Sequence, residues 1–181
     1  MKNKPIIINL FAGSGAGKST GAAYIFSQLK MKGVNCELVT EYAKDKTWEK
    51  TEKIFENQAY IFGKQYYRLS RLHGEVDLII TDSPLLLSIV YNSSNVLGNN
   101  FNNMVLDVFN SYYNINYYIN RTKKYNPKGR WQTTEEAKEL DVRVKNTLVN
   151  SNISFNEISG DVEGYDLAVK DIIKWLKNVN V

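Results

Sequence analysis

Five short apolar runs, separated by longer segments of mixed polarity, mark the chain. The first run, Pro5 to Phe11 (PIIINLF), is unbroken and rich in β-branched residues, which is typical of a strand buried on both faces. Later runs predict four more strands, at Val34–Thr40, Val76–Thr81, Ile115–Ile119 and Ile153–Ile158. Because helical segments separate these runs, the pattern predicts an α/β fold around a mostly parallel sheet of about five strands.

The helical segments are recognised by their periodicity and by their ends. A helix from about Lys18 to Lys32 follows the first run, and Gly33 is well placed to end it. A long helix is expected over about Thr47–His73, because apolar positions recur there at alternating spacings of four and three residues. Those positions are Phe55, Ala59, Phe62, Tyr66 and Leu69.

Polar residues mark where the later helices begin. In Asp82-Ser83-Pro84, Ser83 is placed to cap a helix whose first residue is Pro84. Thr133 and Glu136 fit a capping box for a helix that reaches about Val149. We also expect a polar loop over Asn92–Asn103 and helices over Phe101–Tyr112 and Val162–Lys177.

Composition and charge limit the class of protein. The chain has 181 residues, of which 43% are hydrophobic and 23% charged, and this is a globular rather than a disordered composition. Its 23 Lys and Arg against 19 Asp and Glu give a net charge of +4. Such mild basicity suits an anionic ligand without requiring nucleic acid.

The organisation of the chain points to one domain in a reducing compartment. No internal repeat or long linker divides residues 1–181, so a single domain is expected. The one cysteine, Cys36, excludes an intramolecular disulfide and a cysteine-rich metal site. The N-terminal apolar run is too short for a signal peptide or a membrane span, so we expect a cytoplasmic protein without membrane attachment.

The strongest chemical signal is the segment Ala12–Ser19 (AGSGAGKS), which approximates the phosphate-loop (P-loop) pattern G-x-x-x-x-G-K-[ST]. A buried strand precedes it and a helix follows it, as this motif requires. Its glycines let the backbone bend so that successive N–H groups face one anion, and the helix N-terminus adds a positive dipole end. Ala12 stands at the first glycine position, which matters only if that position needs a positive φ.

The residues of this loop are expected to bind ATP and Mg²⁺. Lys18 supplies a mobile positive charge for the terminal phosphates, and the Ser19 hydroxyl is a candidate Mg²⁺ ligand. The alternative is a glycine-rich turn with no ligand. The expected nucleotide-binding residues are Gly13, Ser14, Gly15, Ala16, Gly17, Lys18, Ser19 and Thr20.

Two carboxylates follow predicted strands. Asp82 closes the third buried run, where a carboxylate holds Mg²⁺ directly or through water; its alternative role is a helix N-cap. Glu41 follows the second strand, and the carboxyl ends of parallel strands converge on the ligand crevice. Glu41 is therefore a candidate to accept the proton of an attacking hydroxyl or to hold the acceptor, the alternative being a solvated Glu paired with Lys44 or Lys46. Asp82 is a second candidate for the base.

A basic segment follows the fourth predicted strand. Arg121 to Arg130 carries five basic residues, and no acidic residue appears before Glu135. Fixed guanidinium groups stabilise the charge of a phosphoryl group in transit, so Arg121 and Arg130 are candidate catalytic residues. The alternative is a solvated basic loop.

Polar residues on the long predicted helix are candidates to bind the acceptor. Gln58 and Gln65 lie seven residues apart and so share one face, and Arg68 lies one turn beyond Gln65. An amide is both donor and acceptor and can bind the edge of a nucleobase, whereas the alternative is an ordinary exposed face. Tyr42 is a candidate to stack on the base or ring, the alternative being an ordinary core residue.

The chain resembles the small P-loop nucleoside and nucleotide kinases, and within them the ribosylnicotinamide-kinase type and its phage-encoded relatives. The P-loop carries most of the resemblance, and the weaker matches are Thr40–Lys44 (TEYAK), Thr81–Pro84 (TDSP) and Lys128–Arg130 (KGR). The resemblance covers nearly the whole chain. It implies a three-layer P-loop NTPase sandwich, with helices on both faces of the sheet and a lid over about 121–134.

The resemblance also implies roles for individual residues. In such kinases a carboxylate at the position of Glu41 binds or activates the acceptor, and polar residues on the helix of Gln58, Gln65 and Arg68 read it. The segment that holds Gly160 and Asp161 corresponds to the part that wraps the adenine, mainly through backbone contacts.

These features predict an ATP- and Mg²⁺-dependent kinase that transfers the γ-phosphoryl group to a hydroxyl or phosphate of a nucleoside- or nucleotide-like acceptor. Two alternatives stay open. One is a kinase that acts on polymeric DNA, such as on a hydroxymethylated base in phage DNA. The other is a nucleotide-dependent ATPase or switch that binds a partner. The sequence also leaves open whether the chain forms a homodimer.

Overall fold

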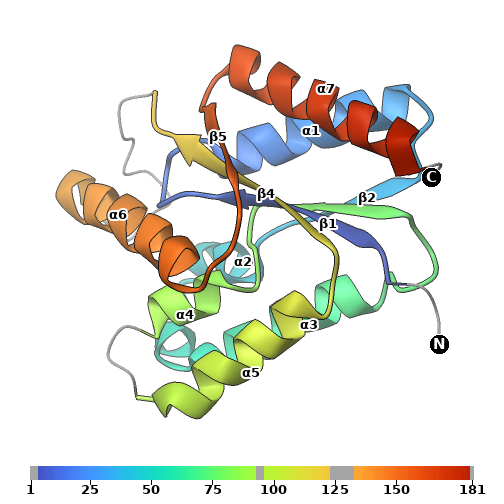
Figure 1. Ribbon diagram of the computed structural model, residues 1–181. Coiled ribbons are helices and arrows are strands. Elements are labelled where there is room, and N and C mark those ends of the chain that lie inside the picture. The colour runs from blue at the N-terminus through green and yellow to red at the C-terminus, as the bar shows by residue number, and fades with distance from the viewer. Residues whose placement is uncertain (1–3, 93–95, 123–132, 180–181) are drawn as a thin grey trace.

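A five-stranded parallel sheet forms the centre of the molecule (Figure 1), whose computed structural model describes residues 4–92, 96–122 and 133–179. The strand order is β2-β3-β1-β4-β5, and every neighbouring pair is parallel. The expected fold class is therefore confirmed. The strands are β1 (Ile6–Phe11), β2 (Cys36–Val39), β3 (Leu78–Thr81), β4 (Asn114–Asn120) and β5 (Asn156–Ser159).

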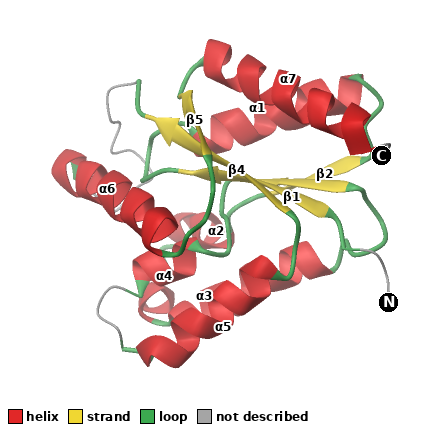
Figure 2. Cartoon of the chain, viewed as in Figure 1, coloured by secondary structure: helices red, strands yellow, loops and turns green. Residues whose placement is uncertain are grey.

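Helices cover both faces of this sheet and so complete three layers (Figure 2). On one face, α1 (Lys18–Met31) packs beside α7 (Val162–Val179). The other face carries α3 (Gln58–Ser70), α4 (Leu87–Tyr91), α5 (Gly98–Asn110) and α6 (Thr134–Asn150). Within the described ranges, no helix combines the length and the apolar character that crossing a membrane requires.

The unbroken apolar character of β1 follows from its place at the middle of the sheet. Ile7 and Phe11 pack into the core under α3 to α6, whereas Ile8 and Leu10 pack into the core under α1 and α7. Successive side chains of a strand point to opposite faces, so a strand covered on both faces needs apolar residues at nearly every position.

The prediction of one long helix over Thr47–His73 is wrong. The chain forms α2 (Tyr42–Trp48), then a short 3-10 helix (η1, Glu52–Glu56), and only then α3. Lys50 adopts a left-handed φ of 54°, and Asn57 caps α3 by accepting a hydrogen bond from the backbone N–H of Tyr60 at 3.0 Å. Phe55 therefore precedes α3, and Ala59 is exposed. Local backbone chemistry interrupts the periodic pattern.

The helix after β3 also starts later than expected. Its N-cap position is Leu86, and Ser83 caps nothing there; the backbone N–H of Ser83 instead donates to Thr81 Oγ1 at 3.1 Å. α5 begins at Gly98, within the segment expected to be a loop. The capping box at Thr133 and Glu136 is confirmed, with both of its hydrogen bonds present.

The Asn57 cap is testable, because it accounts for one end of the interruption before α3. Replacing Asn57 with Ala removes the acceptor for the Tyr60 N–H and should lower the free energy of unfolding by about 1 kcal/mol. Asn103→Ala, at an exposed position inside α5, is the matched control and should leave stability unchanged or slightly raised. Urea denaturation measures both, and equal stabilities for the two variants would contradict the assignment of the cap.

Candidate nucleotide-binding site

The P-loop connects the carboxyl end of β1 to the start of α1. Positive φ values occur at Gly15 (75°) and Gly17 (115°), where glycine is needed, and not at Ala12. The substitution at the first glycine position of the motif therefore causes no backbone strain. The loop keeps the turn that the motif predicts.

Lys18 points back into the loop. Its Nζ donates to the carbonyl oxygens of Ala12 and Gly13, each at 2.9 Å. Burial lowers the pKa of this ammonium, while the carboxylates of Glu41 and Asp82 act in the opposite direction. The two carboxylates that the sequence singled out therefore lie close enough to Lys18 to influence its charge.

The donor set near Lys18 suits Mg²⁺. Ser19 and Thr20 are exposed on the first turn of α1, and Asp82, directly after β3, is buried with 2% of the residue exposed. Mg²⁺ prefers oxygen ligands and is usually held by one or two carboxylates together with substrate phosphates and water. Among the residues described, no group of three or more His, Cys, Asp or Glu could hold a metal by itself.

Glu41 and Asp82 come together because β2 and β3 are neighbours in the sheet. The backbone N–H of Glu41 donates to Asp82 Oδ1 at 3.0 Å. Burial raises the pKa of the Glu41 carboxyl; Lys18 opposes this shift, and the Asp82 carboxylate adds to it. A carboxyl with a raised pKa beside a P-loop is a candidate for proton transfer.

The turn that carries Glu41 is held by side chains from α3. The backbone N–H of Tyr42 donates to Gln65 Oε1 at 2.9 Å, and Gln65 Nε2 donates to the Thr40 carbonyl at 3.3 Å. Arg68 donates to the same carbonyl at 3.1 Å and forms an ion pair with Asp45. Gln65 and Arg68 therefore bind the backbone on both sides of Glu41.

The other acceptor candidates lie near this turn, in different settings. Tyr42 is buried, with the Arg68 guanidinium 5.2 Å from its ring centre, and its hydroxyl donates to the Tyr60 hydroxyl at 3.1 Å. Gln58 lies at the first position of α3, where its amide donates to the Phe55 carbonyl at 3.0 Å.

Arg121 lies directly after β4 and contacts the P-loop. Its Nη2 donates to the Ser14 carbonyl at 2.8 Å, and its Nε donates to Asp141 Oδ2 at 2.9 Å. The other oxygen of Asp141 accepts from the Gly13 N–H at 2.6 Å. Arg130, the second arginine candidate, and most of the expected lid lie outside the described residues.

Sequence reasoning missed Asp141. The signal that could have found it is its place in α6, between the buried positions Ala137, Leu140 and Val144. A carboxylate within the apolar stripe of an amphipathic helix requires a partner from another element. The partners here, Gly13 and Arg121, cannot be deduced without the tertiary structure.

A protein-family model described as an AAA domain matches residues 7–164. The chain belongs to this AAA-domain family. The matched range includes every candidate residue from Gly13 to Asp161. No curated protein matches the sequence.

Solved structures share the fold of this AAA-domain chain. A structure of deoxyadenosine kinase from M. mycoides with the products dCMP and a flexible dCDP bound is 20% identical, with a TM-score of 0.55. A structure of deoxyadenosine kinase from M. mycoides with dATP bound is 21% identical, with a TM-score of 0.57. Each comparison covers 95% of this chain and 99% of the kinase chain.

In this AAA-domain chain the start of α7 packs against the P-loop. A Cβ atom at Gly160 would lie 2.7 Å from the Ala16 carbonyl, so the backbone after β5 touches the loop. Asp161 accepts from Ser159 Oγ at 2.5 Å and from the Gly164 N–H at 3.0 Å. These hydrogen bonds lower the pKa of Asp161, which thereby caps the first turn of α7.

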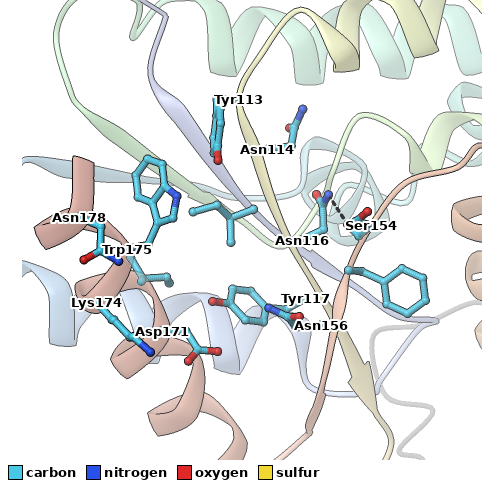
Figure 3. Close-up of a pocket in the computed structure, with 13 residues that line it drawn as sticks. Tyr113, Asn114, Asn116, Tyr117, Ser154, Asn156, Asp171, Lys174, Trp175 and Asn178 are labelled. Atoms are coloured by element: carbon cyan, nitrogen blue, oxygen red, sulfur yellow. Dashed lines mark hydrogen bonds between the residues drawn. The ribbon is translucent and has the colours of Figure 1, made fainter. Parts of the chain in front are cut away.

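A hollow of about 490 Å³ lies at the other end of the strands from the P-loop, beside the amino ends of β4 and β5 (Figure 3). Trp175 of α7 and Tyr113 stand at one side of it. The buried amide of Asn116 is already bonded, because Asn116 accepts from Asn9 at 3.0 Å and donates to the Ser154 carbonyl at 3.0 Å. Since the charged candidates converge on the P-loop instead, we place the candidate site there.

Gly17 provides a test of the loop geometry. A Cβ atom at Gly17 would lie 2.4 Å from the Tyr165 hydroxyl, and its φ of 115° disfavours any L side chain. Gly17→Ala should therefore lower the free energy of unfolding by about 3 kcal/mol, through strain and overpacking together. Gly63→Ala is the matched control: Gly63 lies in α3 with open space around it, so this change should stabilise the protein by about 0.5–1 kcal/mol. Chemical denaturation distinguishes the two, and a Gly17→Ala protein as stable as wild type would contradict the geometry.

Proposed function

We propose that this chain is an ATP- and Mg²⁺-dependent kinase that phosphorylates a hydroxyl or phosphate group of a nucleoside- or nucleotide-like small molecule. The observation that carries the proposal is the convergence of Lys18, Glu41 and Asp82 at the carboxyl ends of three parallel strands. The phosphate-binding loop would hold the nucleotide, and the partly buried Glu41 carboxyl with its raised pKa would serve the acceptor, so both partners of a phosphoryl transfer have a candidate site. The dATP, dCMP and dCDP bound to the deoxyadenosine kinase structures support a nucleoside or nucleotide acceptor.

The nucleotide would bind across the P-loop and the start of α1. The backbone N–H groups from Ser14 to Thr20 would hold the phosphates, and Lys18 would bind the terminal ones. The Gly13 N–H already donates to Asp141, so Gly13 contributes by letting α6 approach. Gly160 and Asp161 would border the adenine. Ser19 and Asp82 would hold Mg²⁺, which neutralises phosphate charge when bound.

The acceptor would bind on the side of Glu41. Its hydroxyl or phosphate oxygen attacks the γ-phosphorus, the bond to the bridging oxygen of ADP breaks, and Glu41 takes the proton when a hydroxyl is the acceptor. Arg121 would stabilise the charge of the transferred group, with Arg130 as a second candidate. Tyr42 and Gln58 would contact the acceptor. Gln65 and Arg68 would act on it through the turn that they hold, as their backbone contacts suggest.

The first test is transfer itself. Purified protein, γ-labelled ATP and Mg²⁺ are offered pooled nucleosides, nucleoside monophosphates, ribosylnicotinamide, and plain or hydroxymethylated DNA. We expect label on one small acceptor, and a loss of about 100-fold or more in Lys18→Ala, because its charge is removed from the phosphates. Lys30→Ala, on the exposed end of α1, is the matched control and should behave as wild type.

The other outcomes of this screen separate the alternatives. Label only on DNA would replace the small-molecule proposal with a DNA kinase. ATP hydrolysis that depends on Lys18 and labels no acceptor would contradict the kinase and favour a nucleotide-dependent switch. Gel filtration of the same preparation decides whether the active species is a homodimer.

The pH dependence of transfer tests Glu41. The carboxylate must be deprotonated to take a proton, and burial raises its pKa above the ordinary value of 4.5. With a hydroxyl acceptor, kcat/KM should therefore fall as the pH is lowered through this raised pKa. Glu41→Gln should lower kcat/KM by about 100-fold or more and remove that acidic limb, because the base is lost.

Glu56→Gln, an exposed change in the nearby 3-10 helix, serves as the control and should keep the wild-type profile. An acidic limb that persists in Glu41→Gln with little loss of rate would assign the base to another group, with Asp82 the next candidate.

A further inference from the structure

Asp141 of α6 joins three parts of the candidate site through one carboxylate. Its Oδ1 accepts from the Gly13 N–H at 2.6 Å, and its Oδ2 accepts from Arg121 Nε at 2.9 Å. Arg121 Nη2 lies 2.9 Å from the same Oδ2 and also donates to the Ser14 carbonyl at 2.8 Å. The P-loop, the end of β4 and α6 therefore meet at a single ion pair.

This geometry fixes the direction of the Arg121 guanidinium. A planar guanidinium whose Nε donates to a carboxylate while its Nη2 donates to a backbone carbonyl has little freedom to rotate. The ion pair is mostly buried, with 14% of the Arg121 side chain and 18% of the Asp141 side chain exposed. Competition from water is correspondingly weak, so the orientation of Arg121 depends on Asp141.

Asp141 is itself held rigidly. Its backbone carbonyl accepts from the Tyr118 hydroxyl at 3.0 Å, and the capping box at Thr133 fixes the start of α6. A Cβ atom at Gly13 would lie 2.7 Å from the Ala137 carbonyl, so α6 packs directly on the loop backbone. The carboxylate thus has a fixed place relative to the P-loop.

Both charged groups of this ion pair act electrostatically on Lys18 of the P-loop. The Asp141 carboxylate acts to raise the pKa of Lys18, and the Arg121 guanidinium acts to lower it. A carboxylate beside a phosphate-binding loop would by itself weaken the binding of an anion through like-charge repulsion. The Asp141 carboxylate would favour nucleotide binding if the gain from orienting the Arg121 guanidinium exceeds the repulsion between the carboxylate and the phosphates.

We propose that Asp141 is a positioning residue for nucleotide binding: it holds the Arg121 guanidinium against the P-loop in the orientation that meets the terminal phosphates. The proposal rests on the proposed function in one respect, that the ligand of the loop is a nucleoside triphosphate. It needs no acceptor and no phosphoryl transfer. A role limited to packing α6 on the loop would give the same fold but a different response to mutation.

A double-mutant cycle on the binding of Mg·ATP separates the two roles. Isothermal titration calorimetry gives Kd for wild type, Asp141→Asn, Arg121→Ala and the double variant. Asp141→Asn should weaken binding by about tenfold, as for coupled neighbours, because Arg121 loses its fixed orientation. In the Arg121→Ala background the same change should have no effect or tighten binding, because only the repulsive carboxylate is then removed.

A purely structural role predicts the same weakening in both backgrounds, and that result would overturn the proposal. Wild-type affinity in Asp141→Asn would overturn it too. Glu139→Gln, an exposed carboxylate-to-amide change on the same helix, is the matched control and should bind Mg·ATP as wild type. Because the cycle measures only the binding of Mg·ATP, a failure to find phosphoryl transfer would contradict the proposed kinase activity without deciding the role of Asp141.

A second comparison covers the case in which Asp141→Asn does not fold, as thermal unfolding would reveal. Arg121→Lys keeps the charge and leaves Asp141 intact but lacks the two-nitrogen fork. If orientation matters, Arg121→Lys should weaken Mg·ATP binding nearly as much as Arg121→Ala. Binding equal to wild type in Arg121→Lys would overturn the proposal, because charge without a fixed orientation would then suffice.

Discussion

The close packing of the P-loop between two helices is the constraint on which the rest of the site depends. α6 approaches at Gly13 and α7 approaches at Gly17, and at both positions a Cβ atom would lie within 2.7 Å of an atom of the approaching helix. The Tyr165 hydroxyl donates to the Gly17 carbonyl at 3.0 Å, and Asp141 accepts from the Gly13 N–H. The motif glycines therefore do more than permit a turn. They let two helices from distant parts of the chain fix the loop from both sides.

Around this loop the structure separates the candidate ligand-binding residues from the residues that hold them in place. Lys18 and Glu41 are the candidates to meet the ligands, while Gln65 uses both ends of its amide on the backbone beside Glu41. Asp141 likewise uses both of its carboxylate oxygens, one on the Gly13 N–H of the loop and the other on Arg121. Buried polar side chains bonded in this way resist movement, because breaking one bond leaves a desolvated group. The Gln65 amide thus holds the backbone beside Glu41, and the ion pair between Asp141 and Arg121 holds the guanidinium beside the loop.

The sequence predicts those parts of the arrangement that depend on residues close to one another in the chain. The strands, the P-loop and the capping box at Thr133 depend on residues that are close in the chain, and all are found in the structure. The long helix was wrong because periodicity alone does not register the Asn57 cap or the left-handed turn at Lys50. Sequence reasoning did not reach the contacts of Gln65 and Asp141, since Gln65 binds the backbone of Tyr42, 23 residues away, and Asp141 binds that of Gly13, 128 residues away.

The two carboxylates at the ends of β2 and β3 cannot be treated as independent. Asp82 Oδ1 accepts from the backbone N–H of Glu41, so the residue expected to hold Mg²⁺ also fixes the turn expected to face the acceptor. Replacing Asp82 with Ala would remove the expected metal ligand, release that N–H and alter the charge felt by Lys18 at once. Its effects on nucleotide and acceptor would therefore be mixed. A change confined to the Glu41 side chain leaves the backbone hydrogen bond in place, because a carboxyl-to-amide replacement does not alter the N–H. The separate contribution of the acceptor side is therefore accessible through Glu41 and not through Asp82.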